Sequence, residues 1–190
     1  MLGESAGQLR ERARWSEHER ATLSFGYGLS VTAVQLARIY AAIANGGTVR
    51  PLTILKSDQP YPGEQVLAPE HAAAMLEMME ANIMPGGTAT RAKVKGYRVG
   101  GKTGTSRKAI AGGYGDDYVA SFAGVGPVSN PRLACVVVIN EPAGDFYHGG
   151  EIAAPVFANI MAATLQLLNL PPDGNTQPRI TALVGGSNAG

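Results

Sequence analysis

A lysine and two threonines stand among three glycines in the run Gly100-Gly101-Lys102-Thr103-Gly104-Thr105. Lysine offers a mobile cation with three donors, and threonine hydroxyls can bind a carboxylate or pass on a proton. If the run is a strand, Lys102 and Gly104 point to one face while Thr103 and Thr105 point to the other. Both sets reach one ligand only at the edge of a sheet, where free backbone groups can also bind an extended peptide. We therefore expect an edge strand beside a cleft, with Gly104 leaving the backbone open to a ligand. A hairpin strand with a solvated lysine is the alternative, and these residues taken alone favour it.

The composition is that of one ordinary globular domain. The chain has 190 residues, a net charge of +1, 45% hydrophobic residues and 16% charged residues. Balanced charge and sparse aromatic residues argue against nucleic-acid binding. A lone cysteine, Cys135, and three scattered histidines lack the spacing of a disulfide framework or a metal site. We expect no metal, no cofactor, no membrane-length apolar run and no signal peptide at Met1.

Three helices are expected from helical spacing of apolar residues. The first covers residues 31–45, with Ser30 or Thr32 as its cap, and the second covers residues 69–83. Residues 154–169 form the last, and its expected core face comprises Val156, Phe157, Ile160, Met161, Thr164, Leu167 and Leu168. Thr88 is placed to cap a short turn that runs to Lys93.

Three strands are expected between the second and third helices. Residues 97–106 and 118–125 are joined through residues 111–117, which are too glycine-rich for regular structure and are expected to form a lip. The unbroken apolar run of residues 133–139 predicts a central strand covered on both faces by helices. Connections of hairpin length make these strands antiparallel. The expected fold is α+β, an antiparallel sheet with helices on both faces, spanning residues 1–170 and followed by a disordered tail at residues 171–190.

Several motifs in consistent order resemble the class B penicillin-binding proteins, most closely the septal peptidoglycan D,D-transpeptidases of Gram-negative cell division. The likeness covers residues 3 to about 173, and it is carried by residues 21–28, 31–32, 35–38, 85–89, 95–105, 136–142, 147–150 and 154–157. It implies the transpeptidase fold shared by penicillin-binding proteins and β-lactamases. It also implies acyl transfer, in which a serine attacks the D-Ala-D-Ala bond of a peptidoglycan stem peptide and β-lactams trap that serine.

The resemblance assigns roles to residues of the Lys-Thr-Gly strand. Lys102 and Thr105 would be catalytic, the lysine in the proton relay and the backbone N–H of Thr105 in the oxyanion hole. Thr103 and Thr105 would hold the donor carboxylate, with Gly104 between them and Arg107 adding positive charge.

An aromatic wall is also implied by the resemblance. Tyr118 and Tyr147 would line the substrate site, together with His148. Ordinary packing is the alternative for each of the three, and it is the stronger reading for His148.

The family's nucleophile motif is absent from this sequence. No serine is followed by lysine three positions later, and none is followed by asparagine two positions later. We therefore expect the chain to be the C-terminal portion of a transpeptidase domain, and an incomplete fold. The nucleophile, an N-terminal module and an inner-membrane anchor would precede it, with the catalytic domain in the periplasm and membrane proteins of the division machinery as partners.

Two hypotheses follow for the chain itself. It is either part of a septal transpeptidase, inactive without its serine, or a non-catalytic module. Such a module would be a truncated product that folds poorly, or one that binds stem peptides or division partners without turnover. A β-lactamase is a weaker third possibility, because the motifs outside Lys-Thr-Gly favour the transpeptidases.

Overall fold

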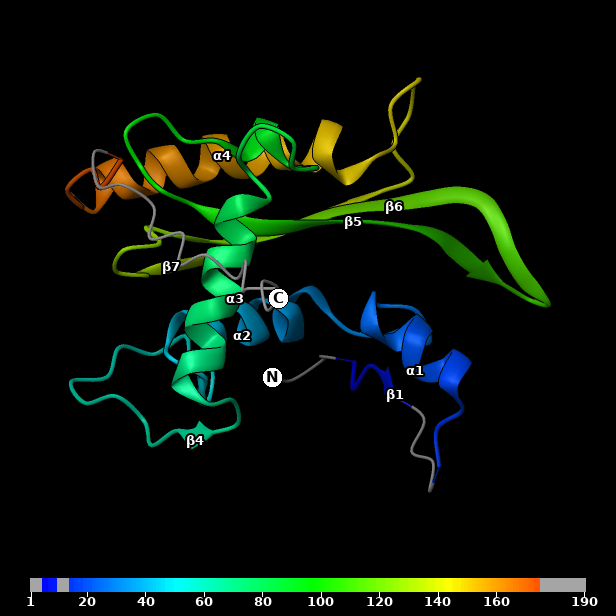
Figure 1. The fold of residues 1–190 in the computed structure, drawn as a ribbon, viewed down its shortest axis with the longest axis horizontal. Helices are drawn as coiled ribbons and strands as arrows, with labels where there is room; N and C mark the ends of the chain where they lie inside the picture. Colours follow the sequence, from blue (N-terminus) through cyan, green and yellow to red (C-terminus); the bar gives the residue numbers. More distant parts are fainter. Residues whose placement is uncertain (1–4, 10–13, 175–190) are drawn as a thin grey trace, which may run out of the picture.

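The computed structural model describes residues 5–9 and 14–174. Its centre is a three-stranded antiparallel sheet in the order β5-β6-β7, formed by β5 (Gly100–Ile110), β6 (Gly113–Gly126) and β7 (Leu133–Asn140) (Figure 1). Helix α4 (Gly149–Leu167) packs over one face, and helices α2 (Ala33–Ala44) and α3 (Pro69–Ala81) pack over the other. The predicted α+β class and the antiparallel pairing are both confirmed.

Close packing of α4 on the sheet depends on a glycine under an aromatic ring. Phe122 of β6 and Phe157 of α4 are fully buried, and their ring centroids are 4.7 Å apart. A Cβ atom at Gly124 would lie 2.8 Å from Cζ of Phe157, so only glycine leaves room for this ring. Burying a pair of aromatic rings contributes on the order of a few kcal/mol to folding, which makes this contact the centre of the core.

Smaller elements surround the sheet. The N-terminal part contains α1 (Glu17–Ser24) and a two-stranded ribbon of β1 (Gln8–Leu9) with β2 (Leu29–Ser30). A second ribbon pairs β3 (Thr48–Val49) with β4 (Glu64–Gln65), and a single 3-10 turn, η1, spans Thr90–Ala92. None of the helices in the described ranges is long and apolar enough to cross a membrane.

Thr32 caps α2 as the sequence predicts. Its hydroxyl accepts a hydrogen bond from the Gln35 N–H at 3.1 Å, and the Gln35 side chain accepts one from the Thr32 N–H at 2.8 Å. This reciprocal capping box satisfies two backbone donors that the first turn of a helix leaves without partners.

We expect Thr32→Ala to lower the free energy of unfolding by about 1 kcal/mol, because one of those donors loses its acceptor. Urea denaturation of the chain measures the change. Thr164→Ala is the control, since the Thr164 hydroxyl only bonds back to the Ile160 carbonyl of its own helix, and alanine favours helix. An equal loss of unfolding free energy in Thr32→Ala and Thr164→Ala would contradict the capping role of Thr32.

The prediction of a glycine-rich lip at residues 111–117 is wrong, because this segment belongs to a long hairpin. Strand β6 already begins at Gly113, and Ile110 pairs with it across a turn made by Ala111 and Gly112. Gly112 has a φ of +88°, which glycine adopts without strain. The hairpin therefore projects beyond the helices, as the green ribbon at the right of Figure 1 shows.

The run at residues 133–139 forms β7, but not as a central strand. Helices α2 and α4 both contact it, as predicted. Within the described part of the chain it pairs only with β6, so it lies at the sheet edge. Val138 is consequently 48% exposed, and Cys135 is only half-buried, where partial burial raises the pKa of its thiol.

The expected core face of the last helix is also partly wrong. Helix α4 begins at Gly149, earlier than predicted, and its buried large side chains are Phe157, Met161 and Leu165. These recur every four residues and so form one stripe against the sheet. The predicted core residues Val156, Ile160, Leu167 and Leu168 are instead exposed. In α2, Ile39 is likewise 49% exposed, although it stands at the helical spacing from which this helix is predicted.

Asp173 and Gly174 hydrogen-bond to residues near the sheet. The Asp173 carboxylate accepts hydrogen bonds from the Arg98 N–H at 2.7 Å and from the Ser129 hydroxyl at 2.6 Å. The Gly174 N–H donates to the Gly96 carbonyl at 2.9 Å. The rest of the predicted tail, residues 175–190, lies outside the described residues.

Candidate functional site

The Lys-Thr-Gly run forms part of β5, and β5 is an edge strand as predicted. It pairs with β6 on one side, and no strand in the described part of the chain pairs with its other side. Lys102 and Arg107 are exposed, whereas Thr103, Gly104 and Thr105 are half-buried. An extended peptide could therefore be added along this edge by main-chain hydrogen bonds.

The two threonines point toward α4. The Gly149 N–H, in the first turn of α4, donates to the Thr105 hydroxyl at 3.1 Å. A Cβ atom at Gly150 would lie 3.4 Å from the Thr103 methyl group. The first turn of α4 thus packs behind both threonines and hydrogen-bonds to the hydroxyl of Thr105.

Lys102 points to the opposite face, as the alternation of a strand requires. There it lines a cavity of about 360 Å³ between α2 and α3, whose other walls include Ile39, Tyr40, Met75, Met78 and Asn82. Its ammonium group donates to the Thr103 carbonyl at 2.8 Å and lies 3.4 Å from the Thr103 hydroxyl. The cation and the hydroxyls of β5 therefore meet at one edge from opposite faces.

Two further residues reach this edge that sequence reasoning did not assign to the site. The Asn82 amide nitrogen donates to the Gly101 carbonyl at 2.8 Å, and the Asn82 oxygen accepts from the Thr88 hydroxyl at 2.9 Å. The Thr88 and Thr103 hydroxyl oxygens are 3.2 Å apart. The predicted cap at Thr88 is therefore wrong, since η1 follows Ala89 and has no side-chain cap.

The two missed residues differ in how visible they are in the sequence. Pro85-Gly86-Gly87 marks a turn, and Thr88 directly after it is visible in the sequence, where it is predicted only as a cap. Nothing near Asn82 indicates that it reaches a strand 19 residues later.

A contact with β6 also favours glycine at position 104, in addition to the predicted need for an open backbone. A Cβ atom there would lie 2.5 Å from the hydroxyl oxygen of Ser121, its partner on β6. A larger residue would therefore require the Ser121 hydroxyl to turn away from the site.

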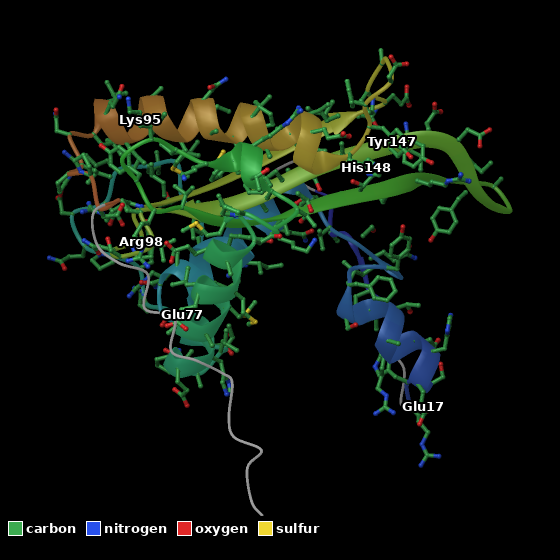
Figure 2. All side chains as sticks on the ribbon, turned by 45° about the horizontal axis from the view of Figure 1, so that its top comes forward. Glu17, Glu77, Lys95, Arg98, Tyr147 and His148 are labelled. Atoms are coloured by element: carbon green, nitrogen blue, oxygen red, sulfur yellow. The ribbon has the colours of Figure 1, made fainter. Side chains whose placement is uncertain are left out.

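Arg107 and the predicted aromatic residues form one stack. Arg107 pairs with Tyr118 across the hairpin, and its Nε–H donates to the Tyr118 hydroxyl at 3.3 Å. This hydrogen bond is the main reason why the pKa of the Arg107 guanidinium is raised. Tyr118 stacks on Tyr147 with centroids 4.3 Å apart, and Tyr147 lies 4.3 Å from the His148 ring. Figure 2 shows Tyr147 and His148 at the end of α4 from which the hairpin projects.

The donor set of the site suits an anion rather than a metal. Lys102, Arg107 and the hydroxyls of Thr103 and Thr105 are all hydrogen-bond donors at or near the edge. In the described ranges, no group of three or more histidine, cysteine, aspartate or glutamate residues could hold a metal ion. The arrangement can bind a carboxylate at the end of an extended peptide.

Curated proteins similar to this chain are peptidoglycan D,D-transpeptidases. The chain is 48% identical over 177 residues to the peptidoglycan D,D-transpeptidase FtsI of Escherichia coli K12, covering 93% of this chain and 30% of that protein. It is 41% identical to the probable peptidoglycan D,D-transpeptidase PenA of Neisseria gonorrhoeae, covering 96% of this chain and 31% of that protein. The chain thus spans about a third of the length of these relatives.

Solved structures and a family model give the same assignment. The transpeptidase domain of Burkholderia pseudomallei penicillin-binding protein 3 superposes with a TM-score of 0.84 at 45% identity, covering 90% of this chain and 53% of that one. A peptidoglycan glycosyltransferase of Burkholderia ambifaria superposes with a TM-score of 0.81 at 43% identity, covering 94% and 52%. The model of the penicillin-binding protein transpeptidase domain matches residues 1–162. The chain therefore belongs to the penicillin-binding protein transpeptidase domain family.

Proposed function

We propose that this chain supplies the substrate-binding edge of a septal peptidoglycan D,D-transpeptidase, with the nucleophilic serine on polypeptide outside it. The observation that carries the proposal is the edge of β5 with which no strand among the described residues pairs. There Lys102 from one face and the hydroxyls of Thr103 and Thr105 from the other meet beside a strand open to a peptide. The names of the E. coli and N. gonorrhoeae relatives support the reaction class.

The proposed reaction is acyl transfer from a stem peptide ending in D-Ala-D-Ala. The serine oxygen attacks the carbonyl between the two D-alanines, the C–N bond breaks, and D-Ala leaves with a proton on its amine. An amine of a neighbouring stem then attacks the acyl-serine ester. The amide bond of the cross-link forms, the ester C–O bond breaks, and a proton from the attacking amine restores the serine hydroxyl.

Residues of β5 would act at three points of this reaction. Lys102 would hold or move the proton near the serine, because its ammonium lies beside the Thr103 hydroxyl. Thr103 and Thr105 would bind the donor's carboxylate, with Arg107 adding positive charge nearby. The Thr105 N–H would stabilise the oxyanion, and Gly104 would keep the strand close to the peptide.

The stacked rings would form a wall of the same cleft. Tyr118 and Tyr147 lie beside Arg107 and would pack against the apolar parts of a stem peptide or a β-lactam. In the whole protein, we propose an inner-membrane anchor, a periplasmic catalytic domain and membrane proteins of the division machinery as partners.

Labelling with a fluorescent penicillin tests the proposal. The chain by itself is expected to give no covalent adduct on a denaturing gel. A chimera in which the chain replaces its aligned segment in the E. coli relative is expected to be labelled, because that relative supplies the rest of the protein. An adduct on the isolated chain, or a folded chimera that is not labelled while the unmodified relative is, would contradict the proposal.

A non-catalytic binding module is the second candidate, and the sequence favours it in one respect. No serine in the chain is followed three positions later by lysine. Such a module would bind a D-Ala-D-Ala peptide reversibly along β5 without cleaving it. Stoichiometric reversible binding to the chain, together with an unlabelled chimera, would favour this function.

A further inference from the structure

The edge of β5 is closed at its start and open toward the tip of the β5–β6 hairpin. Gly100 and Gly101 are buried under the end of α3, and the Gly101 carbonyl already accepts a hydrogen bond from the Asn82 amide at 2.8 Å. Further along the strand, Ser106 and Arg107 are both exposed. A stem peptide whose terminal carboxylate lies at the two threonines must therefore leave the site toward the hairpin tip.

A cavity of about 500 Å³ lies in that direction, between α1 and the hairpin. Ser106 and Arg107 of β5 line one side of it, Tyr27 and Leu29 after α1 line another, and Tyr114 of β6 lines it from the hairpin. In Figure 1, α1 lies below the projecting hairpin. Because Ser106 and Arg107 belong to both, the cavity is continuous with the open end of the peptide edge.

The distance from the threonines to this cavity matches the length of a stem peptide. Tyr114 pairs with Ala109, four residues beyond Thr105. At roughly 3.3 Å per residue, this is about 13 Å along the strand. A pentapeptide bound by its terminal carboxylate has four further residues, which span at most about 14 Å when extended. The end of the stem that is attached to the sugar chain of peptidoglycan therefore reaches the cavity.

Aromatic rings give this cavity flat apolar surfaces. Tyr27 and Tyr114 meet edge to face with ring centroids 6.4 Å apart, and Phe25 lies 5.6 Å from Tyr27. Tyr114 is 57% exposed and Phe25 is 66% exposed, so their faces are accessible to a ligand. A sugar ring presents a face of C–H groups with small positive charges, which packs well on the negative face of an aromatic ring.

The polar groups of the cavity suit an uncharged ligand. Among the described residues, its charged side chains already have partners: Glu19 belongs to the capping box of α1, and Arg107 bonds within the aromatic stack. Within the same residues, the hydroxyls of Tyr27 and Tyr114 make no hydrogen bond, so both can bond a ligand. A stem peptide carries free carboxylates and an amine, whereas an N-acetylated sugar is uncharged and rich in hydroxyl groups.

We infer that the cavity between α1 and the hairpin binds the carbohydrate end of the donor, the N-acetylated amino sugar to which the stem is attached. The peptide lies along β5, and the sugar packs against Tyr27 and Tyr114. The site thereby favours stems that are still attached to a glycan strand over free peptides. This inference rests on the proposed function and adds a second class of ligand to it.

Competition against a fluorescent penicillin in the chimera tests the inference. Two competitors are compared, the free stem pentapeptide and the same pentapeptide attached to its disaccharide. The measured quantity is the ratio of the two concentrations that halve the labelling rate. In the parent chimera, the disaccharide pentapeptide is expected to compete at about tenfold lower concentration, an advantage of the size that contact with aromatic rings gives. Because the ratio is taken within each variant, a general effect on the peptide site cancels.

Four variants locate the advantage in the cavity. Tyr27→Leu and Tyr114→Leu keep an apolar side chain but remove a ring, and each should lower the ratio about threefold. The double variant should bring the ratio to about one. Tyr114→Phe keeps the ring and should stay within about twofold of the parent. Tyr61→Leu is the control, since it removes an exposed tyrosine from the loop before β4, and it should leave the ratio unchanged.

The outcomes separate this inference from the proposed function. Equal competition by the two ligands in a parent chimera that is labelled would overturn the inference alone, as would the parent ratio in the double variant. A sugar-free acceptor peptide whose competition is lost in the double variant would show that the cavity takes an acceptor stem, and would also overturn the inference. A folded parent chimera that penicillin never labels would overturn the proposed function and this inference with it.

Discussion

Replacing Lys102 by alanine in the chimera should lower the rate of acylation by penicillin about 10²–10⁴-fold, the range for loss of a group that transfers a proton. The ammonium lies at the strand edge, held by the Thr103 carbonyl at 2.8 Å. Alanine removes the one cationic group on that face of the Lys-Thr-Gly run, so the serine would lose both charge stabilisation and a proton carrier. Stopped-flow or gel-based labelling measures the rate.

Two variants make this result specific. Lys95→Ala removes an exposed lysine far from Tyr147 and His148, as Figure 2 shows, and should leave acylation unchanged. Lys102→Arg keeps the positive charge but cannot give up its proton, and its planar group does not fit a site for a compact ammonium. It should be nearly as slow as the alanine variant. Acylation of Lys102→Ala at the parent rate would refute the role of this lysine.

The geometry of the edge strand was predictable because it rests on a local rule. Side chains alternate along any strand, so placing Lys102 opposite Thr103 and Thr105 required only the correct period. The cap at Thr32 was predictable for the same reason, since a capping box is set by residues three apart. Motifs in order along the chain indicated the family, which the matched family model confirms.

What the sequence did not reveal depends on contacts between distant residues. Asn82 reaches the site because α3 ends beside Gly101, and no spacing rule connects the two. The glycine-rich segment after Ile110 looked irregular, yet cross-strand pairing with β5 makes it strand. The buried stripe of α4 was misplaced because its position depends on where the helix meets the sheet.

Arg98→Ala should lower the free energy of unfolding by about 3–5 kcal/mol, the cost of leaving a buried charge without its partner. Glu80 of α3 is only 4% exposed, and the Arg98 side chain makes two hydrogen bonds of 2.6 Å to its carboxylate. The hydrogen bond to Glu80 is also the main reason why the pKa of the Arg98 guanidinium is raised. The pair ties α3 to the residues that lead into β5, far from Tyr147 (Figure 2).

Urea denaturation of the chain measures this loss, and Lys108→Ala is the matched control. Lys108 and Glu141 form an ion pair that is far more exposed, so breaking it should cost about 0–1 kcal/mol.

Because 3–5 kcal/mol is a large part of the stability of a small domain, Arg98→Ala could leave the chain unfolded at 25 °C. The double variant Glu80→Leu with Arg98→Met then decides the matter. It removes both charges, so it should restore a cooperative transition near that of the parent. A loss in Arg98→Ala as small as in the control would show that the buried pair does not hold α3 against the start of β5.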